Sequence, residues 1–343
     1  MDSSGRGVIV AGPFPGPRHG MAIVTEATAD LLDASLRLDL SAGGIGGSRS
    51  DLVKKAQNVV VSLGSLVRRG RKFDHLIVAV DSGEGMLVTF LMVLVGQFHG
   101  LRITLQHHTW AYLREHRGLM DRIVALGKSE LEHVFLCERA AEEFRDAYNP
   151  SGPVVVAGNA FSVPVAEPAS RQRDHLVVGH LANLSEAKGI EDVVVSAKQN
   201  PQVQFLVAGP AADDVARSAL DELGAMPNVE LRGQLDHGQV QRFHSDTDIF
   251  LLPSKTEAMP LVVWEALSAG SSVVAYDVGC VGAMAGGNAI RVATSQDGFQ
   301  AELSAAISER STGEVKDADM RQTFAEVRTR QADEFVSLMQ GRR

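Results

Sequence analysis

The chain has 343 residues, of which 45% are hydrophobic and 5% aromatic, so it is long enough for two domains with full cores. Its formal net charge is −9, and no part of it is basic enough to suggest binding to nucleic acid. The two cysteines, Cys137 and Cys280, are too few and too far apart to indicate a disulfide framework, so we expect a reducing, cytoplasmic compartment.

Near the N-terminus, an expected strand leads into a loop rich in proline and glycine. The polar start does not resemble a signal peptide and runs directly into the strand at residues 8–11. The loop ends at Gly20, just before an expected helix. Gly20 would let backbone amides approach an anion. The alternative interpretation is an ordinary Pro/Gly loop.

The next segments contain a glycine-rich loop and a basic cluster. After the expected strand at residues 36–40, the run Gly43–Gly47 predicts a mobile loop. The cluster between Arg68 and Lys72 lies in a neutral half, because residues 1–165 hold 17 Lys and Arg and 17 Asp and Glu. The rest of the chain carries the whole net charge. The cluster is therefore a candidate for contact with an anionic membrane surface, and a solvated helix end is the alternative.

An uncharged segment and a pair of histidines lie in the middle of this half. The stretch 85–101 has no charged residue, and its dense apolar part, 86–95, is about half as long as a bilayer span requires. We expect a buried helix there. His107 and His108 follow the expected strand at 103–106, whose carboxyl end would face a ligand cleft in an open α/β sheet. Either one of them touches a ligand, or both are polar rim residues.

Two sets of apolar runs alternate with helical segments, which predicts parallel sheets with helices on both faces. Residues 161–174 between the two sets have the composition of a linker. The predicted fold class is α/β, with two doubly wound, Rossmann-like domains. The expected strands are 8–11, 36–40, 76–80, 103–106, 134–136 and 154–156 before the linker, and 176–180, 203–208, 229–232, 249–252 and 272–276 after it.

A Lys-Gly pair lies where the first strand of the second set should lead into a helix. Lys188 and Gly189 precede the helical run at 190–198. A lysine at a helix N-terminus combines its own charge with free backbone N–H groups, and this combination binds anions. Taken alone, the pair is a weak signal, because the dipeptide is common.

The segment 253–270 holds two carboxylates, Glu257 and Glu265, with seven residues between them. Pro260 suits a first helical position and Gly270 suits a helix end, so we predict a strand, a loop and a helix. Glu265 would lie among apolar neighbours, where a carboxylate needs a polar partner. That partner is either a ligand hydroxyl or a Lys or Arg across the domain core.

This segment resembles the signature of the family 4 retaining glycosyltransferases, which belong to the GT-B superfamily and use nucleotide-sugar donors. The similarity runs without a gap and lies late in the chain, as it does in that family. It implies a GT-B fold, in which two Rossmann-like domains face a cleft. The matching residues are Pro253, Ser254, Glu257, Pro260, Glu265, Ala266 and Gly270.

The resemblance also implies roles for individual residues. Glu257 would face the donor sugar and its phosphates, Glu265 would hold the ribose hydroxyls, and Lys188 would grip the diphosphate. The family usually has an arginine shortly before that lysine, where this chain has Asn183 or His180, so half of the cationic clamp is absent or supplied elsewhere. The other expected donor-binding residues are Asn183, Gly20, Gly209, Arg232, Ala258, Met259, Pro260 and Leu261.

From the same resemblance we expect a sugar to be transferred from a nucleotide sugar to an acceptor hydroxyl with retention of configuration, in cell-surface glycan or glycoconjugate synthesis. The expected catalytic residues are Glu257, His107 and His108. No metal and no other cofactor are expected, since the family needs none and the acidic run 246–248 would cap a strand entry. The alternatives are a non-catalytic GT-B subunit that scaffolds a partner enzyme, and a sugar-nucleotide epimerase of the same fold.

The expected domains are an acceptor-side domain at 1–160, a linker at 161–174, a donor-side domain at 175–318, and a final helix at 319–343 that crosses back. The partners would be a nucleotide-sugar donor and an unidentified glycan, lipid or small-molecule acceptor, without nucleic acid. The expected location is cytoplasmic, with peripheral contact at the inner face of the membrane as a further hypothesis.

Overall fold

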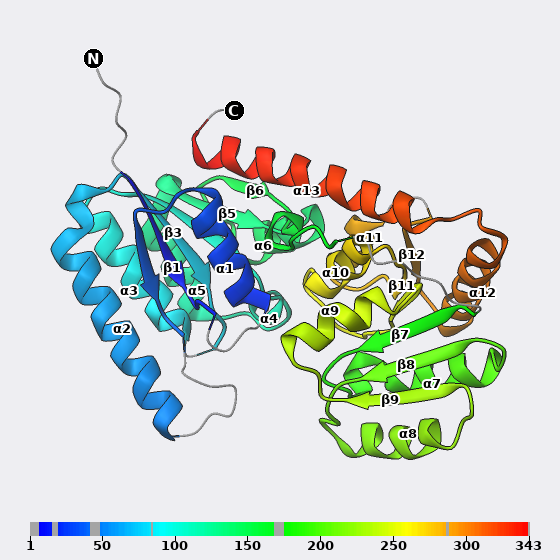
Figure 1. The fold of residues 1–343 in the computed structure, drawn as a ribbon. Helices are drawn as coiled ribbons and strands as arrows, with labels where there is room; N and C mark the ends of the chain where they lie inside the picture. Colours follow the sequence, from blue (N-terminus) through cyan, green and yellow to red (C-terminus); the bar gives the residue numbers. More distant parts are fainter. Residues whose placement is uncertain are drawn as a thin grey trace. The chain divides into compact units, whose positions relative to one another are not determined.

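The chain divides into two compact units (Figure 1). Unit 1 is Met1–Ser162 together with Gln331–Arg343, and unit 2 is Val163–Arg330. Two predicted segments, the Gly43–Gly47 loop and residues 168–174 of the linker, lie outside the described residues. The computed structural model describes residues 7–15, 20–41, 49–83, 85–167, 175–285 and 288–341.

In the described part of unit 1, six parallel strands form one sheet in the order β2-β1-β3-β4-β5-β6. The central strand β3 is buried along its whole length, as its nearly continuous apolar run predicts for a parallel sheet covered on both faces. The strands are β1 (Val8–Gly12), β2 (Leu36–Asp39), β3 (His75–Val80), β4 (Arg102–His107), β5 (Leu131–Phe135) and β6 (Val154–Val156).

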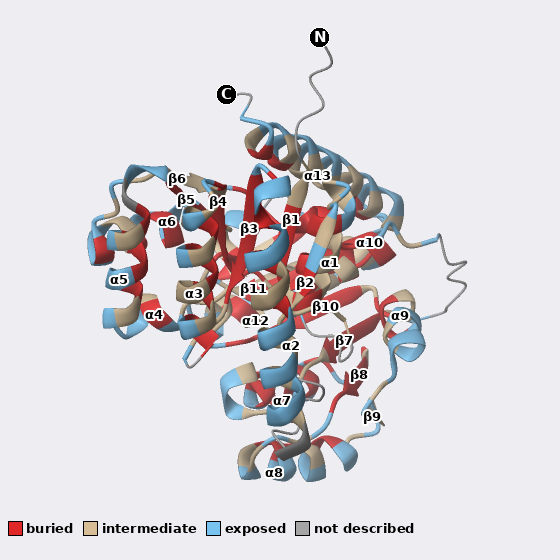
Figure 2. Ribbon diagram, turned by 90° about the vertical axis from the view of Figure 1, so that its left-hand side faces the viewer, coloured by how far each residue is buried: buried red, intermediate tan, exposed pale blue. Residues whose placement is uncertain are grey.

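Helices connect these strands and enclose the sheet, whose buried residues are red in Figure 2. The α-helices are α1 (Gly20–Leu31), α2 (Arg49–Arg69), α3 (Gly85–Phe98), α4 (Ala111–Arg114), α5 (Gly118–Gly127) and α6 (Glu138–Tyr148). The short 3-10 helices are η1 (Gly70–Lys72), η2 (Lys128–Glu130) and η3 (Ala160–Ser162).

The described part of unit 2 also forms a parallel sheet of six strands, in the order β12-β11-β10-β7-β8-β9. The predicted fold class, two doubly wound Rossmann-like domains, is therefore confirmed. The strands are β7 (Val177–Leu181), β8 (Gln204–Ala208), β9 (Val229–Gly233), β10 (Ile249–Leu252), β11 (Ser272–Tyr276) and β12 (Ile290–Ala293).

Helices connect the strands of unit 2, and a long helix, α13, ends this series. They are η4 (Glu186–Lys188), α7 (Ile190–Gln199), α8 (Asp214–Gly224), α9 (His237–Ser245), α10 (Leu261–Ala269), α11 (Val281–Met284), α12 (Gln296–Thr312) and α13 (Asp317–Met339).

The last helix, α13, contributes residues to both units. In unit 2, Arg328 Nε donates to the backbone oxygen of Val163 at 2.9 Å. In unit 1, the side-chain oxygen of Gln331 accepts from the backbone N–H of Ala160 at 2.8 Å. Each part of the helix is therefore fixed by side-chain bonds within its own unit.

Most strands agree with the prediction to within one residue at each end, and two strands differ from it more. β5 begins at Leu131 and includes Glu132, a buried carboxylate that accepts from Arg102 at 2.8 Å. β12 is a strand that the sequence did not predict, since Arg291 interrupts its short apolar run. The guanidinium of Arg291 pairs with Glu302 and Glu309 of α12, which makes the charge tolerable within the strand.

The prediction of a buried helix at residues 86–95 is only half right. α3 forms there, and one of its faces packs on the sheet through Met86, Met92 and Val93. Its other face leaves Leu87 and Leu94 exposed. The helix therefore has no charged residue, although one of its faces is exposed to solvent.

Neither Cys137 nor Cys280 is a free thiol. The expectation of reduced cysteines is therefore wrong, and their number gives no support to a cytoplasmic location. Among the described residues, no helix is both long and apolar enough to cross a membrane.

Candidate functional site

The strand order of unit 2 reverses between the neighbouring strands β7 and β10. From β7 the chain moves outward through β8 to β9, and it then returns to β10 on the other side of β7. Loops after two such strands diverge and leave the crevice in which open α/β sheets bind ligands. The loop after β7 carries Lys188, and the loop after β10 carries Glu257.

Lys188 and Glu257 form an ion pair at this point. Lys188 Nζ donates to Glu257 Oε1 at 2.6 Å. The lysine side chain is 32% exposed and that of the glutamate 13%, so the pair remains within reach of a ligand. The structure thus brings together the expected phosphate-binding cation and the expected catalytic carboxylate. An anionic ligand would compete with Glu257 for the lysine.

A glycine allows the two loops to approach so closely. Gly189 has a φ of +72°, and a Cβ on it would lie 2.0 Å from the backbone oxygen of Pro253. The loops are also joined by a backbone hydrogen bond from Lys255 to Ala187 of 2.9 Å. The Lys-Gly dipeptide therefore combines a cation with a backbone that only glycine adopts without strain.

Two further glycines allow the loops that follow β8 and β11 to pack closely against the loops that carry Lys188 and Glu257. Gly209, after β8, has a φ of +122°, and a Cβ there would lie 1.7 Å from the backbone oxygen of Ala182. Gly279, after β11, has a φ of +59°, and its Cβ would lie 2.0 Å from the backbone oxygen of Glu257. Packing of the loops explains both glycines, so the expected donor contact of Gly209 stays a prediction.

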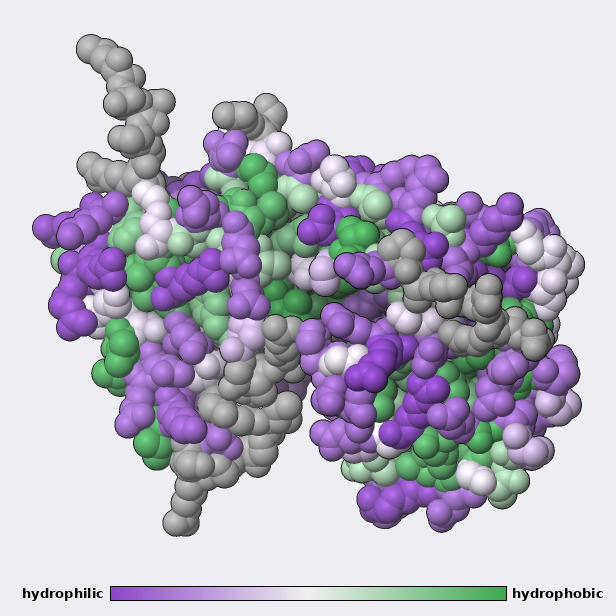
Figure 3. Space-filling model, in the orientation of Figure 1, coloured by the Kyte–Doolittle hydropathy of each residue, from purple (hydrophilic) through white to green (hydrophobic). Residues whose placement is uncertain are grey.

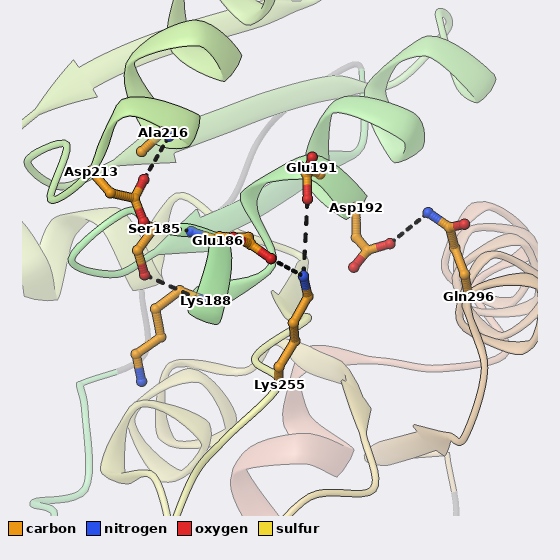
Figure 4. Close-up of polar contacts among 9 residues, drawn as sticks. All are labelled: Ser185, Glu186, Lys188, Glu191, Asp192, Asp213, Ala216, Lys255 and Gln296. Atoms are coloured by element: carbon orange, nitrogen blue, oxygen red, sulfur yellow. Dashed lines mark hydrogen bonds and ion pairs between the residues drawn. The ribbon is translucent and has the colours of Figure 1, made fainter.

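A polar network that the sequence did not predict holds the Lys188 loop in place (Figure 4). Asp213 accepts from the backbone N–H groups of Ala216 and Glu186, at 2.8 and 3.0 Å. These two donors lower the pKa of the Asp213 carboxyl. Lys255 lies beside Glu186 and Glu191, at 3.3 and 3.9 Å. Lys255 is thus committed to carboxylates other than Glu257.

The bend from residue 258 to residue 261 leads into the start of α10. Its N-cap, Pro260, makes no side-chain cap, and the first turn of the helix has no acidic residue. The side chains of Met259 and Leu261 are buried. Of the four expected donor-binding residues here, which also include Ala258, these two could therefore offer a ligand only their backbone groups. Backbone N–H groups at a helix start favour an anion.

Glu265 lies inside α10 and remains about one-third exposed, at 32%. Its Oε2 lies 3.6 Å from Nε2 of His244, a buried residue at the end of α9. The neighbour is therefore a histidine, not the Lys or Arg that was the alternative to a ligand. Because the carboxylate is partly open, its expected role at ribose hydroxyls stays a prediction.

Among the described residues, the candidate positions for completing the cationic clamp carry no free positive charge. Asn183 is an exposed neutral amide. His180 is buried, its Nδ1 lies 3.1 Å from the oxygen of Leu251, and burial lowers its pKa to about 4. Arg232 is paired with Glu230 and Asp246 at 2.8 Å each. Lys188 is therefore the cation that the described loops present beside Glu257.

In unit 1 the structure places His107 in the interior. Its Nδ1 lies 2.5 Å from the hydroxyl of Tyr112, and its Nε2 lies 3.0 Å from Nδ1 of His133. Burial lowers the pKa of His107 well below its usual value. Both ring nitrogens are used internally, so the geometry argues against His107 as a group that touches a ligand.

Unlike His107, His108 and Gly20 have no internal contact within the described part of the chain that argues against a role in ligand binding. His108 Nε2 is buried and has no hydrogen-bond partner among the described residues, and burial lowers its pKa to about 4. Gly20 is the first residue of α1, with open space where a Cβ would be. The loop before it, 16–19, lies outside the described residues. Both residues stay predictions, and His108 is the better of the two histidines.

Unit 1 contains a cavity that the sequence did not indicate. It has a volume of about 220 Å³ and lies beyond the carboxyl ends of β1, β2 and β3, where the strand order of unit 1 reverses. Its polar lining includes Ser41, Thr89 and an ion pair, Lys55 Nζ to Asp81 Oδ2 at 3.2 Å. Apolar residues of α2 and α3 complete the wall.

Comparison with known proteins gives a family match over most of unit 2. Residues 166–326 match the family described as glycosyl transferases group 1. The chain is 29% identical over 174 residues to a subunit of phosphatidylinositol N-acetylglucosaminyltransferase of Schizosaccharomyces pombe. It is 25% identical over 241 residues to alpha-D-kanosaminyltransferase of Streptomyces kanamyceticus.

These similarities cover 47% and 62% of this chain, and 37% and 61% of the two relatives. The chain therefore spans less than two thirds of the length of either relative. Among solved structures, that of HepE of Anabaena in complex with UDP-glucose superposes with a TM-score of 0.67 over 96% of this chain and 100% of the other, at 14% identity. The predicted resemblance to GT-B glycosyltransferases is confirmed, whereas family 4 stays a prediction.

Proposed function

We propose that the chain is a glycosyltransferase that moves a sugar from a nucleotide-sugar donor to an acceptor hydroxyl, with retention of configuration. The observation that carries the proposal is the ion pair between Lys188 and Glu257 at the strand-order reversal of unit 2. This pair lies inside the stretch that matches the group 1 glycosyl transferases. The complex of HepE with UDP-glucose supports a nucleotide sugar as the donor class.

The chemistry follows from what each group can offer. A donor diphosphate would compete with Glu257 for the Lys188 amine, because it carries two negative charges where the glutamate carries one. Lys188 and the backbone N–H groups at the start of α10 would then stabilise charge on the leaving diphosphate. Glu257, released from the lysine, would accept hydrogen bonds from the donor sugar and orient it. Glu265 would bind the ribose hydroxyls.

The acceptor and the location are proposed at a coarser level. A relative named as a phosphatidylinositol N-acetylglucosaminyltransferase subunit supports an acceptor of the glycoconjugate class. The cavity of unit 1, with its Lys55–Asp81 pair, is the candidate acceptor site. We place the chain in the cytoplasm, in peripheral contact with the inner face of the membrane, and we expect no metal requirement.

The test is a screen of nucleotide sugars by thermal shift, followed by release of nucleoside diphosphate with each stabilising donor. The anomeric configuration of the product, read by NMR, decides whether the reaction retains it. A glycosyltransferase releases nucleoside diphosphate, and Lys188→Ala abolishes the release. A non-catalytic subunit releases none with any donor, and an epimerase converts the donor sugar without releasing nucleoside diphosphate.

A further inference from the structure

Helices α2 and α3 pack side by side in unit 1, and both leave apolar side chains in solvent. Monomeric soluble proteins rarely expose apolar residues as a continuous group, so such a group marks an interaction surface. Figure 2, which views this side of unit 1, shows exposed residues along both helices. The exposed apolar residues are Leu52, Val53, Val60, Val61 and Val67 on α2, and Leu87, Leu94 and Phe98 on α3.

The apolar residues of α2 follow a helical repeat on the outward side. Val53, Val60 and Val67 are spaced by seven residues and therefore share one face. Val60 is 69% exposed, whereas Ser62 and Leu66, on the opposite face, are buried. Among the described residues of unit 1, the valines therefore point away from the core and remain largely exposed.

The outward face of α3 has the same character. The helix contains no charged residue, and its exposed positions Leu87, Leu94 and Phe98 are all large and apolar. Phe98 is 75% exposed, which is unusual for a phenylalanine at a helix end. Packing against the core of unit 1 explains why the inner face of α3 is apolar, but it does not explain why the outer face is.

Cations accompany this apolar face. Lys54, Arg68 and Arg69 of α2 and the pair Arg71 and Lys72 of η1 are all exposed, and none of the five makes an ion pair with another described residue. The guanidinium of Arg68 lies 3.8 Å from the Cβ position of Gly64, along the outward side of the helix. Hydrophobic and hydrophilic side chains are interleaved along the α2 edge in Figure 3.

We propose that the outward faces of α2 and α3 dock unit 1 on an anionic membrane surface. A helix that presents valines together with lysines and arginines lies in the interface, with its apolar side chains among the acyl chains and its cations at the headgroups. The charges select this occupant. Residues 163–330, which form unit 2, carry 14 Lys and Arg and 23 Asp and Glu, so an anionic surface repels unit 2 and attracts the basic end of α2.

The cavity in unit 1 connects the proposed docking surface with the candidate acceptor site. Lys55 and Val59 of α2 and Val88 and Thr89 of α3 line that cavity. The two docking helices therefore also form the wall of the candidate acceptor site. This step rests on the proposed function: the acceptor is a lipid-linked molecule that enters from the bilayer with its polar head in the cavity.

The experiment measures partition of the full chain to vesicles by sedimentation, without donor or acceptor. Parent protein should bind vesicles of phosphatidylcholine with phosphatidylglycerol and should not bind phosphatidylcholine alone. Replacing Val53, Val60 and Val67 by Gln, a good helix former, should reduce the partition coefficient at least tenfold. Replacing the four cations from Arg68 to Lys72 by Gln should do the same, since each contributes roughly fivefold.

Matched controls separate this surface from general effects of charge and polarity. Arg114, Arg122, Arg242 and Lys316 are exposed elsewhere, and their replacement by Gln changes the net charge equally. That variant should bind as the parent does. No binding by the parent, or equal loss in this control, overturns the docking surface. The valine variant could also have a lower sedimentation coefficient than the parent in the absence of lipid. That result would assign the apolar face to contact with a second copy of the chain, and it would also overturn the docking surface.

Activity then tests the acceptor step separately from the docking. If the parent binds anionic vesicles but releases nucleoside diphosphate with no donor, the docking surface stands and the proposed function fails. If it transfers sugar only to water-soluble acceptors, and the valine variant is equally active on them, the lipid-linked acceptor is excluded. Faster transfer to an acceptor in vesicles than to its soluble headgroup, abolished in the valine variant, supports both.

Discussion

The ion pair between Lys188 and Glu257 joins two residues that the sequence had singled out for different reasons. Lys188 was predicted from a helix start, and Glu257 from a family signature. Their contact could not be predicted, because it depends on how closely the two loops approach through Gly189 and Pro253. For the same reason, the sequence could not show that both ring nitrogens of His107 are used inside the protein, since their partners lie on other elements of unit 1.

The first prediction concerns Lys188. Lys188→Ala should weaken binding of a nucleoside diphosphate by about 1.5–3 kcal/mol, because a charge-assisted hydrogen bond to phosphate is lost. Titration calorimetry measures the change. Lys255→Ala is the matched control, since Lys255 lies in the facing loop but is held by Glu186 and Glu191. Equal losses in both variants would mean that only the local charge matters.

The second prediction separates Glu257 from a simple donor-binding residue. Glu257→Gln should tighten nucleoside-diphosphate binding by up to about fivefold, because a partly exposed ion pair worth at most about 1 kcal/mol no longer competes for Lys188. The same variant should lower kcat, since the orienting carboxylate is lost. Calorimetry and steady-state kinetics give the two values. Weaker binding together with unchanged kcat would contradict the assignment.

At the scale of elements, apolar runs and helical periodicity predicted most strands and helices. The exceptions have a common cause. β5 was predicted too short and β12 was missed because each contains a charged residue, Glu132 or Arg291, that is tolerated only through a partner on another element. A local pattern does not contain that partner. For α3, the pattern could not show that only one side of an apolar helix would be covered.

The third prediction concerns the glycines of the unit 2 loops. Gly189→Ala should destabilise unit 2 by about 1–3 kcal/mol, because it adds backbone strain and a Cβ 2.0 Å from Pro253 O. Gly233→Ala is the control for strain alone: its φ is +61°, and nothing lies within 4 Å of the added Cβ. Denaturant unfolding gives both values. Equal costs would show that the approach of the two loops does not require the glycine.

At the scale of the molecule, composition and strand alternation predicted two α/β domains, and the structure has two such units. The distribution of buried histidines between the units was not predictable, because burial depends on neighbours across the sheet. Burial lowers the pKa of His75 and of His133 to about 3, and that of His108 to about 4, all in unit 1. In unit 2 it lowers that of His180 to about 4.

The last prediction follows from this unequal distribution. A histidine with a pKa of 6.5 in the unfolded chain and a lower pKa in the fold stabilises the folded state above pH 6.5, and the contribution is lost as the pH falls toward the folded value. The loss is about 1.4 kcal/mol per pH unit for each such histidine. Acidification from neutral pH should therefore unfold unit 1 before unit 2.

The two tryptophans allow the units to be followed separately, since Trp110 belongs to unit 1 and Trp264 to unit 2. Trp264→Phe leaves fluorescence from unit 1, and Trp110→Phe leaves fluorescence from unit 2. As the pH is lowered from 7 toward 4, the denaturant midpoint should fall more steeply in the variant that reports unit 1, because unit 1 holds more histidines with depressed pKa values. Above pH 7 both midpoints should be insensitive to these histidines. Parallel slopes in acid would show that the buried histidines of unit 1 do not control its acid stability.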